Sequence, residues 1–243
     1  MNAIETHKLR KSYKDTAAVN GLDLTVKQGE LFSLLGVNGA GKTTTIKMLS
    51  CLTKPTSGEA YIMGKSVDGD AEEIKKIINV SPQETAVAPN LTVRENLEFV
   101  CGIYGFDKAT ARRKAAEMIE EFKLGEIESK RAKTLSGGWQ RRLSIAMALI
   151  SEPQILFLDE PTLGLDVLAR RELWSIIEKL KGKITVILTT HYLEEAEALS
   201  DTIAVMAKGS LVAMGSAQEL KDKSGCTDFE DAFVKLCSGG VQI

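Results

Sequence analysis

Short apolar runs with the length of a β-strand recur along the chain, separated by segments with helical periodicity. The runs at 31–35, 155–158 and 184–188 are apolar almost throughout, which is typical of strands buried on both faces of a parallel sheet. Helices are expected at 44–49, 167–180 and 192–199. This alternation of strands and helices predicts an α/β fold around a mostly parallel sheet.

The middle of the chain, from about residue 87 to residue 152, changes character and becomes helical. Thr92 and Glu95 have the spacing of a capping box, and Leu97, Val100 and Tyr104 follow on one helical face. A second helix over 110–123 has an apolar face made of Ala111, Ala115, Met118 and Phe122. We therefore predict an α-helical subdomain inserted into the sheet domain, with these apolar faces in its core.

Segments near the two ends complete the expected fold. Residues 58–64 are predicted to join the N-terminal strands in a small antiparallel β subdomain, and Lys208-Gly209-Ser210 is typical of a hairpin turn. From residue 221 onward, four apolar residues recur at helical spacing, which predicts one docked C-terminal helix. These residues are Phe229, Ala232, Phe233 and Leu236. We divide the chain into a main domain, 1–220, and a C-terminal helical tail, 221–243.

The composition limits the possible classes of function. With 243 residues, 44% of them hydrophobic, the chain is long enough for one domain with a sizeable core. Its net charge of −2 leaves no basic surplus, so we expect no nucleic-acid partner. No apolar run has the length of a membrane span, and the N-terminus lacks the apolar core of a signal peptide. The scattered cysteines favour reduced thiols, and a Cys226–Cys237 disulfide is the less favoured alternative.

The candidate chemistry begins where the first apolar run ends. Residues 36–43, Gly-Val-Asn-Gly-Ala-Gly-Lys-Thr, fit the phosphate-loop pattern G-x-x-x-x-G-K-[ST] between a predicted strand and a predicted helix. In such a loop backbone N–H groups surround the phosphates, Lys42 adds a positive charge and Thr43 offers a hydroxyl to Mg²⁺. The alternative is a glycine-rich turn that binds nothing. The predicted nucleotide-binding residues are Gly36, Asn38, Gly39, Ala40, Gly41, Lys42, Thr43 and Thr44.

Two carboxylates follow the second apolar run. Asp159 and Glu160 lie at the carboxyl end of a predicted strand, the edge at which open α/β sheets bind ligands. Asp159 is the candidate Mg²⁺ ligand, and Glu160 is the candidate base for the attacking water. The alternative is a solvated acidic turn after a strand.

A second candidate anion-binding loop precedes a long apolar segment. Ser136, Gly137 and Gly138 stand at the start of a predicted helix, where backbone N–H groups are free to bind an anion. Only the first of the two loops carries a lysine. The pair of loops therefore suggests a nucleotide shared between two copies of the chain.

With these residues the chain resembles the nucleotide-binding subunit of an ABC transporter. The resemblance rests on Leu-Ser-Gly-Gly at 135–138 and Leu-Asp-Glu-Pro at 158–161, and it extends over about 4–220. It implies a P-loop NTPase core of the RecA-like type, with ATP and Mg²⁺ as ligands. Trp139 departs from the signature, which usually has Gln at this position. Either its indole packs against a partner or the change is simple family variation.

The resemblance also implies roles for four further residues. Tyr13 would stack on the adenine, and Gln83 would contact both the Mg²⁺ and the γ-phosphate. Asp166 would lie at a dimer interface, and His191 would contact the γ-phosphate. Taken singly, each has a structural alternative: a strand tyrosine, a loop glutamine, a helix N-cap that can coexist with the interface role, and an ordinary polar histidine. For His191, its position after a predicted strand favours the functional interpretation. Lys42, Gln83, Glu160 and His191 form the expected catalytic set.

The function implied by the resemblance is ATP hydrolysis that powers export through a separate membrane permease. The expected partners are that permease and a second copy of this chain or a homologous ATPase subunit. The expected location is the cytoplasmic face of the cell membrane, with permease docking near 84–91 and 99–104. An importer motor remains an alternative, as does an ABC ATPase that acts on ribosomes or DNA. The second alternative is disfavoured by the single phosphate loop and the absence of a long heptad run.

Overall fold

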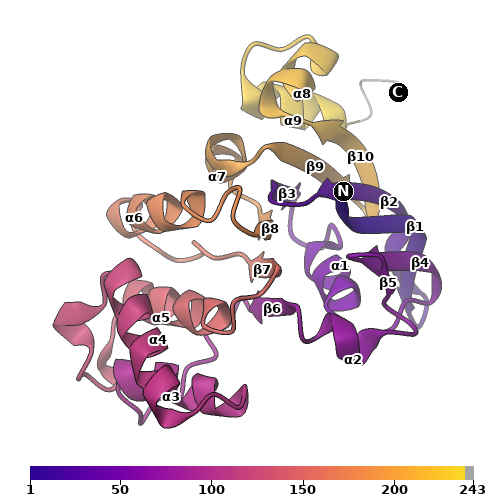
Figure 1. Ribbon diagram of the computed structural model, residues 1–243. Helices are drawn as coiled ribbons and strands as arrows, with labels where there is room; N and C mark the ends of the chain where they lie inside the picture. The colour runs from indigo at the N-terminus through magenta and orange to yellow at the C-terminus, as the bar shows by residue number, and fades with distance from the viewer. Residues whose placement is uncertain (239–243) are drawn as a thin grey trace.

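The computed structural model describes residues 1–238 and contains two β-sheets and a group of helices (Figure 1). The part of the predicted tail at 239–243 lies outside the described residues. The strands are β1 (Asn2–Tyr13), β2 (Thr16–Lys27), β3 (Leu31–Leu35), β4 (Ser57–Ile62), β5 (Lys65–Ser66), β6 (Ile78–Ser81), β7 (Ile155–Asp159), β8 (Thr185–Thr190), β9 (Thr202–Ala207) and β10 (Ser210–Gly215). The helices are α1 (Lys42–Leu49), α2 (Ala71–Ile74), α3 (Val93–Ile103), α4 (Lys108–Glu121), α5 (Gly137–Leu149), α6 (Val167–Glu178), α7 (Leu193–Leu199), α8 (Ala217–Ser224) and α9 (Phe229–Cys237), with 3₁₀ turns at Gly125–Ile127 and Ala132–Thr134.

The larger sheet has six strands in the order β10-β9-β3-β8-β7-β6. Its neighbouring strands are parallel except for β9 and β10, which are joined by a tight turn at Lys208 and Gly209, both with positive φ. Every residue of β3, β7 and β8 is buried, as expected for strands that are covered on both faces. The predicted mostly parallel sheet and the hairpin are both confirmed. The carboxyl ends of β3, β7 and β8 meet at one edge.

The smaller sheet is antiparallel, with strand order β2-β1-β4-β5. Apolar residues on its inner face pack against α1 and one face of the large sheet in a single cluster. This cluster includes Leu22 of β2, Ile62 of β4, Ile46 of α1 and Phe157 of β7. The predicted antiparallel β subdomain is confirmed. This subdomain contributes to the site, because Thr16, Ala17 and Ala18 at the start of β2 border the phosphate loop.

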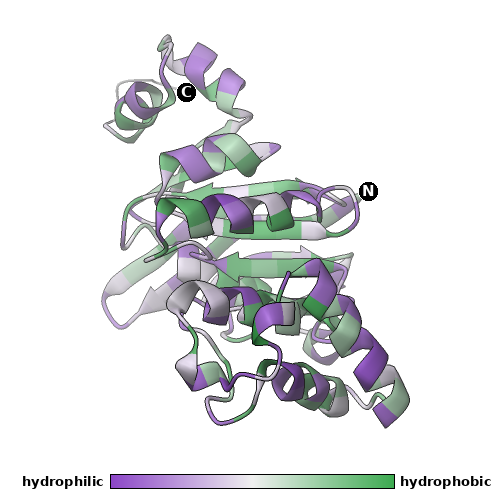
Figure 2. Cartoon of the chain, turned by 90° about the vertical axis from the view of Figure 1, so that its left-hand side faces the viewer, coloured by the Kyte–Doolittle hydropathy of each residue, from purple (hydrophilic) through white to green (hydrophobic). Residues whose placement is uncertain are grey.

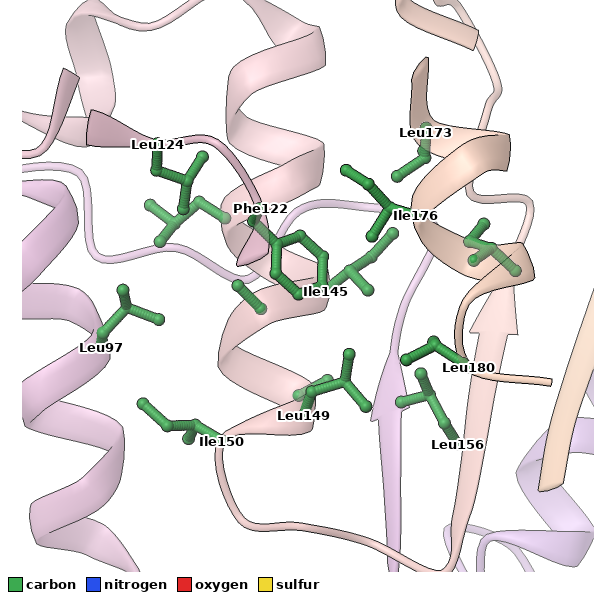
Figure 3. Close-up of a cluster of buried hydrophobic side chains, with 14 of the residues drawn as sticks. Leu97, Phe122, Leu124, Ile145, Leu149, Ile150, Leu156, Leu173, Ile176 and Leu180 are labelled. Atoms are coloured by element: carbon green, nitrogen blue, oxygen red, sulfur yellow. The ribbon is translucent and has the colours of Figure 1, made fainter. Parts of the chain in front are cut away.

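The helices α3, α4 and α5 form a separate lobe within the predicted 87–152 range (Figure 1). Figure 3 shows how this lobe joins the sheet domain: Leu97 of α3, Ile145 of α5 and Leu173 of α6 belong to one buried cluster. The predicted capping box of Thr92 and Glu95 is present. The apolar face predicted for α3 was wrong at Tyr104, which is 43% exposed because it lies beyond the last helical residue; Cys101 is buried instead.

The C-terminal tail packs on the same molecule. Helix α9 buries Phe229 and Leu236 in a cluster with residues of β9, β10 and α7, and Phe233 is partly buried against it. Ala232 of the same helix is also buried. The docked helix is therefore confirmed. The proposed boundary between residues 220 and 221 falls inside α8. Figure 2 shows apolar residues concentrated in the strands, with polar and apolar residues interspersed along the helices.

Candidate functional site

The phosphate loop connects β3 to α1 through a backbone path that needs glycine. Gly41 caps α1 with φ 101°, and a Cβ atom there would lie 2.5 Å from the Ala18 carbonyl oxygen. At Gly36 a Cβ atom would lie 2.3 Å from the Met206 carbonyl oxygen. A larger side chain would push the loop away from the sheet at both positions. In the described structure no side chain caps the first turn of α1. The N–H groups of this turn are therefore free to bind an anion held in the phosphate loop.

Lys42 is held at the centre of this loop. Its side chain is 5% exposed, and its ammonium donates to the Gly36 carbonyl oxygen at 2.6 Å and to the Val37 carbonyl oxygen at 3.3 Å. The same ammonium lies 3.5 Å from Glu160 Oε1. These contacts place a buried positive charge between the phosphate loop and the end of β7. Lys42 and Glu160, which belong to two separate sequence motifs, therefore lie side by side at one edge of the sheet.

Asp159 and Thr43 present adjacent oxygen atoms. The Thr43 hydroxyl donates to Asp159 Oδ1 at 3.2 Å, and the Thr189 hydroxyl donates to the same carboxylate oxygen at 2.5 Å. Asp159 is 5% exposed and Thr189 is fully buried. Hydroxyl and carboxylate oxygens are the ligands that Mg²⁺ prefers. Thr189 was not predicted from sequence, although a threonine that ends a buried strand beside the Asp159 strand is a signal that could have revealed it.

Glu160 follows with an unusual backbone. Its φ is 48°, in the left-handed region that non-glycine residues avoid. Its N–H donates to the Thr189 hydroxyl at 3.0 Å and to the Thr189 carbonyl oxygen at 3.1 Å, which fixes the conformation. Its carboxylate lies 2.7 Å from His191 Nδ1. Glu160 and His191, distant in sequence, are thus in direct contact at the edge of the sheet.

A cavity of about 420 Å³ opens in front of the phosphate loop. This volume lies within the usual range of small-molecule sites. It is lined by Thr16, Ala17, Ala18, Asn38, Gly39, Ala40, Gly41, Lys42, Thr43, Thr44, Gln83 and Glu160. Tyr13 is not among the lining residues; it ends β1 opposite Thr16 and is 46% exposed, with the Lys11 ammonium 5.1 Å from the centre of its ring. The lining from Thr16 to Ala18 was missed from sequence, because these residues begin β2 directly after a hairpin turn and carry no phosphate signature.

The second loop lies outside this cavity. Ser136 caps α5 and is exposed, as is Gly137, and neither they nor Gly138 belong to the cavity lining. Asp166 is also exposed and caps α6 by accepting a hydrogen bond from the N–H of Ala169 at 2.9 Å. Trp139 is partly buried against the core of its own chain, and the Arg142 guanidinium lies 4.6 Å from its ring centre. One molecule therefore brings together the Lys42 loop and the carboxylates but leaves the Ser136 loop apart.

Two buried charged residues behind the site were not predicted. Arg141 is 4% exposed and contacts the backbone of Gln83 and Glu160. Glu195 is fully buried, and its Oε1 accepts a hydrogen bond from Trp174 Nε1 at 2.9 Å. Burial raises the pKa of the Glu195 carboxyl above its ordinary value. Both belong to helical segments whose charged residues usually face solvent, so the sequence pattern gave no signal.

The chain is similar to proteins of a known family. A family model described as ABC transporter matches residues 19–163. A daunorubicin/doxorubicin resistance ATP-binding protein of Streptomyces peucetius is 45% identical over 224 residues, which cover 92% of this chain and 68% of that protein. Phospholipid-transporting ATPase ABCA3 of Homo sapiens is 43% identical over 216 residues, which cover 89% of this chain and 13% of that protein.

A solved structure also matches over most of the chain. It is a dimeric, post-hydrolysis ATP-binding cassette bound to ADP and Pi, with a TM-score of 0.80 and 28% identity over 88% of this chain and 98% of that one. Within residues 1–238, no helix has both the length and the apolar character of a membrane span. The relatives favour the exporter-type subunit over the importer motor and over an ABC ATPase of ribosomes or DNA. The chain belongs to the ABC transporter family, as an ATP-binding and ATP-hydrolysing subunit of the exporter type.

Proposed function

We propose that this chain works as a dimer on the cytoplasmic face of the cell membrane, where ATP hydrolysis drives export through a separate permease. Members of this family dimerise and work with membrane permease subunits. The observation that carries the proposal is the division of the site: Lys42, Asp159 and Glu160 surround one cavity, while Ser136 is exposed outside it. A second copy, or a homologous ATPase subunit, would bring its own Ser136 loop to this cavity.

In this proposal each residue around the cavity has a separate part in nucleotide binding. The N–H groups of residues 39–44 bind the phosphates at the start of α1, where the helix dipole favours anions. The Lys42 ammonium lies 3.5 Å from Glu160 Oε1, so the γ-phosphate competes with this carboxylate for it. Tyr13, at the exposed end of β1, covers the adenine. The backbone of Gly137 and Gly138 in the partner copy adds donors to the γ-phosphate, and the partner's Asp166 loop crosses the interface.

The oxygens of Thr43 and Asp159 fit a Mg²⁺ site. They lie 3.2 Å apart beside the phosphate loop, and Thr189 orients the carboxylate from behind. Gln83 lines the same cavity and can add its side-chain oxygen. These hard oxygen donors match the preference of Mg²⁺, which usually binds through one or two protein groups together with substrate phosphates. When bound, the ion would neutralise phosphate charge.

Glu160 is the proposed group that orients the attacking water and accepts its proton. Its left-handed backbone and its two N–H contacts to Thr189 hold the carboxylate at the end of β7. His191, 2.7 Å from Glu160 Oε2, restrains the same carboxylate and reaches toward the γ-phosphate. A general base of this kind contributes about 10²–10⁴-fold to a rate.

The Glu160→Gln variant tests the catalytic assignment. The amide keeps the shape of the side chain but cannot accept the proton, so MgATP should bind with nearly wild-type affinity while turnover falls about 10²–10⁴-fold. The variant should also accumulate as an ATP-dependent dimer in size-exclusion chromatography. Near-normal turnover would overturn the role of Glu160, and a monomer at saturating MgATP would overturn the shared site. Glu194→Gln, an exposed glutamate near His191, is the matched control.

The proposed permease contact lies at the end of α3. Phe99 is 54% exposed and Ile103 is 65% exposed, an unusual density of apolar surface on one short helix. Val87 packs against the core cluster instead, so it is a poor site for a docking variant. Phe99→Glu and Ile103→Glu should abolish membrane attachment and transport while the isolated chain keeps its ATPase activity. Val234→Glu, at a 59% exposed position on α9, should change neither. Equal effects at all three positions would contradict this docking surface.

A further inference from the structure

A buried arginine connects the helix behind Ser136 to the catalytic site of the same chain. Arg141 lies on α5, whose first residue follows Ser136 directly. Its guanidinium donates to the carbonyl oxygens of Pro82 at 2.5 Å, Gln83 at 2.6 Å and Glu160 at 3.1 Å. One planar group therefore holds the backbone of the Gln83 loop and the backbone at the end of β7 in a fixed relation to α5.

The neighbouring Gln140 makes a parallel connection. Its side-chain oxygen accepts a hydrogen bond from the Thr85 hydroxyl at 3.4 Å, and its amide nitrogen donates to the carbonyl oxygens of Ala132 at 3.1 Å and Leu135 at 3.3 Å. The first turns of α5 thus contact the Gln83 loop on one side and the segment leading into Ser136 on the other. A displacement of the Ser136 loop would therefore move α5 and, through the contacts of Gln140 and Arg141, the Gln83 loop.

The guanidinium is costly to bury, and its surroundings explain how the charge is tolerated. Arg141 is 4% exposed, and desolvation lowers its pKa from the ordinary value. The nearby carboxyl groups of Asp159, Glu195 and Glu160 act in the opposite direction and favour the charged form. Its hydrogen bonds go to backbone carbonyls rather than to a carboxylate, so its role is to fix the positions of chain segments.

We propose that Arg141 is a positioning residue that couples the Ser136 loop, which completes the partner's nucleotide site, to Gln83 and Glu160 of its own site. This inference rests on the shared site of the proposed function. When ATP of the partner site draws the Ser136 loop to its γ-phosphate, α5 carries Arg141 with it. The carbonyls of Gln83 and Glu160 then follow, so engagement of one site prepares the other for hydrolysis.

A lysine cannot replace this connection. Lysine retains the positive charge, but its single ammonium lacks the planar fork that spans the Pro82, Gln83 and Glu160 carbonyls. Arg141→Lys therefore separates charge from geometry, and Arg141→Gln removes the charge as well. Arg113→Lys on α4 is the matched control, because Arg113 is 62% exposed and forms an ion pair with the exposed side chain of Glu117.

The test uses the full chain and compares binding with turnover. For Arg141→Lys we expect kcat to fall about 10–100-fold, since a small misplacement of a catalytic group has effects of this size. The Kd of a fluorescent ATP analogue should stay within about threefold of the wild-type value, since the phosphate loop is untouched. The Hill coefficient for ATP should fall toward one. Hydrogen exchange should increase at residues 83–88 and remain unchanged in α4. Arg113→Lys should match the wild type in every measurement.

The possible outcomes separate this inference from the proposed function. Wild-type kcat and Hill coefficient in Arg141→Lys would overturn the coupling role. A parallel loss of ATP affinity, turnover and folded fraction would show that Arg141 only supports the fold. If the Glu160→Gln protein forms no ATP-dependent dimer, the shared site fails and the cross-site coupling fails with it. If that dimer forms normally while Arg141→Lys keeps its cooperativity, only the role of Arg141 fails.

Discussion

Replacing Thr189 by valine gives a sharp test of how the site is held, because valine has nearly the same shape but no hydroxyl. Thr189 is fully buried, donates to Asp159 Oδ1 at 2.5 Å and accepts from the Glu160 N–H at 3.0 Å. The Glu160 N–H keeps its second acceptor, the Thr189 carbonyl oxygen at 3.1 Å. The loss is therefore dominated by one hydrogen bond to a charged group.

The expected loss of stability follows from the loss of this one hydrogen bond. A hydrogen bond to a charged group is worth about 1.5–3 kcal/mol, and about 1 kcal/mol shifts the melting temperature of a domain of this size by about 2–4 °C. Thr189→Val should therefore lower the melting temperature by about 3–12 °C. Because Asp159 loses the group that orients it, the Mg²⁺ concentration that gives half-maximal ATPase activity should rise about 10–100-fold.

Thr185→Val is the matched control at the opposite end of the same strand. Thr185 is 2% exposed, and its hydroxyl accepts from the Gly29 N–H at 3.0 Å, far along β8 from Asp159. Calorimetry should show a loss of stability of about 1 kcal/mol, while the Mg²⁺ dependence of the ATPase should stay at the wild-type value. An equal shift of the Mg²⁺ dependence in both variants, or none in Thr189→Val, would refute the proposed orientation of Asp159.

The remaining predictions concern the buried carboxyl and the second loop. Burial raises the pKa of the Glu195 carboxyl in the folded state, so the folded protein loses stability as the pH rises through this pKa. Glu195→Gln should therefore melt at a higher temperature than the wild type at about pH 8 and lose this advantage at about pH 5. Thermal melts followed by circular dichroism test this. A variant that melts lower at both pH values would contradict a raised pKa of the buried Glu195 carboxyl. Ser136→Arg should abolish hydrolysis without weakening ATP binding to the monomer, whereas Trp139→Gln should keep most of its ATPase activity, because the indole packs on its own chain.

Local patterns in the sequence were sufficient for many of the elements and for the motif of the phosphate loop. A strand buried on both faces is continuously apolar whatever its neighbours are, so β3, β7 and β8 were visible without a structure. The same holds for the capping box of α3, which depends on two side chains three residues apart. The run from Gly36 to Thr43 carries its chemistry in consecutive residues, and so did the pair of Asp159 and Glu160.

The tertiary structure decided everything that depends on residues distant in sequence. The contacts of Thr189 with Asp159, and of Arg141 with Gln83, join segments that only the order of strands and the packing of α5 bring together. The burial of Glu195 was decided in the same way, since a helix with several glutamates gives no sign of which one faces inward. The sequence by itself indicated the groups that we propose to carry the chemistry, because each motif is local. The fold determined how these groups are held, because buried charges and hydroxyls are oriented by partners that lie far away along the chain.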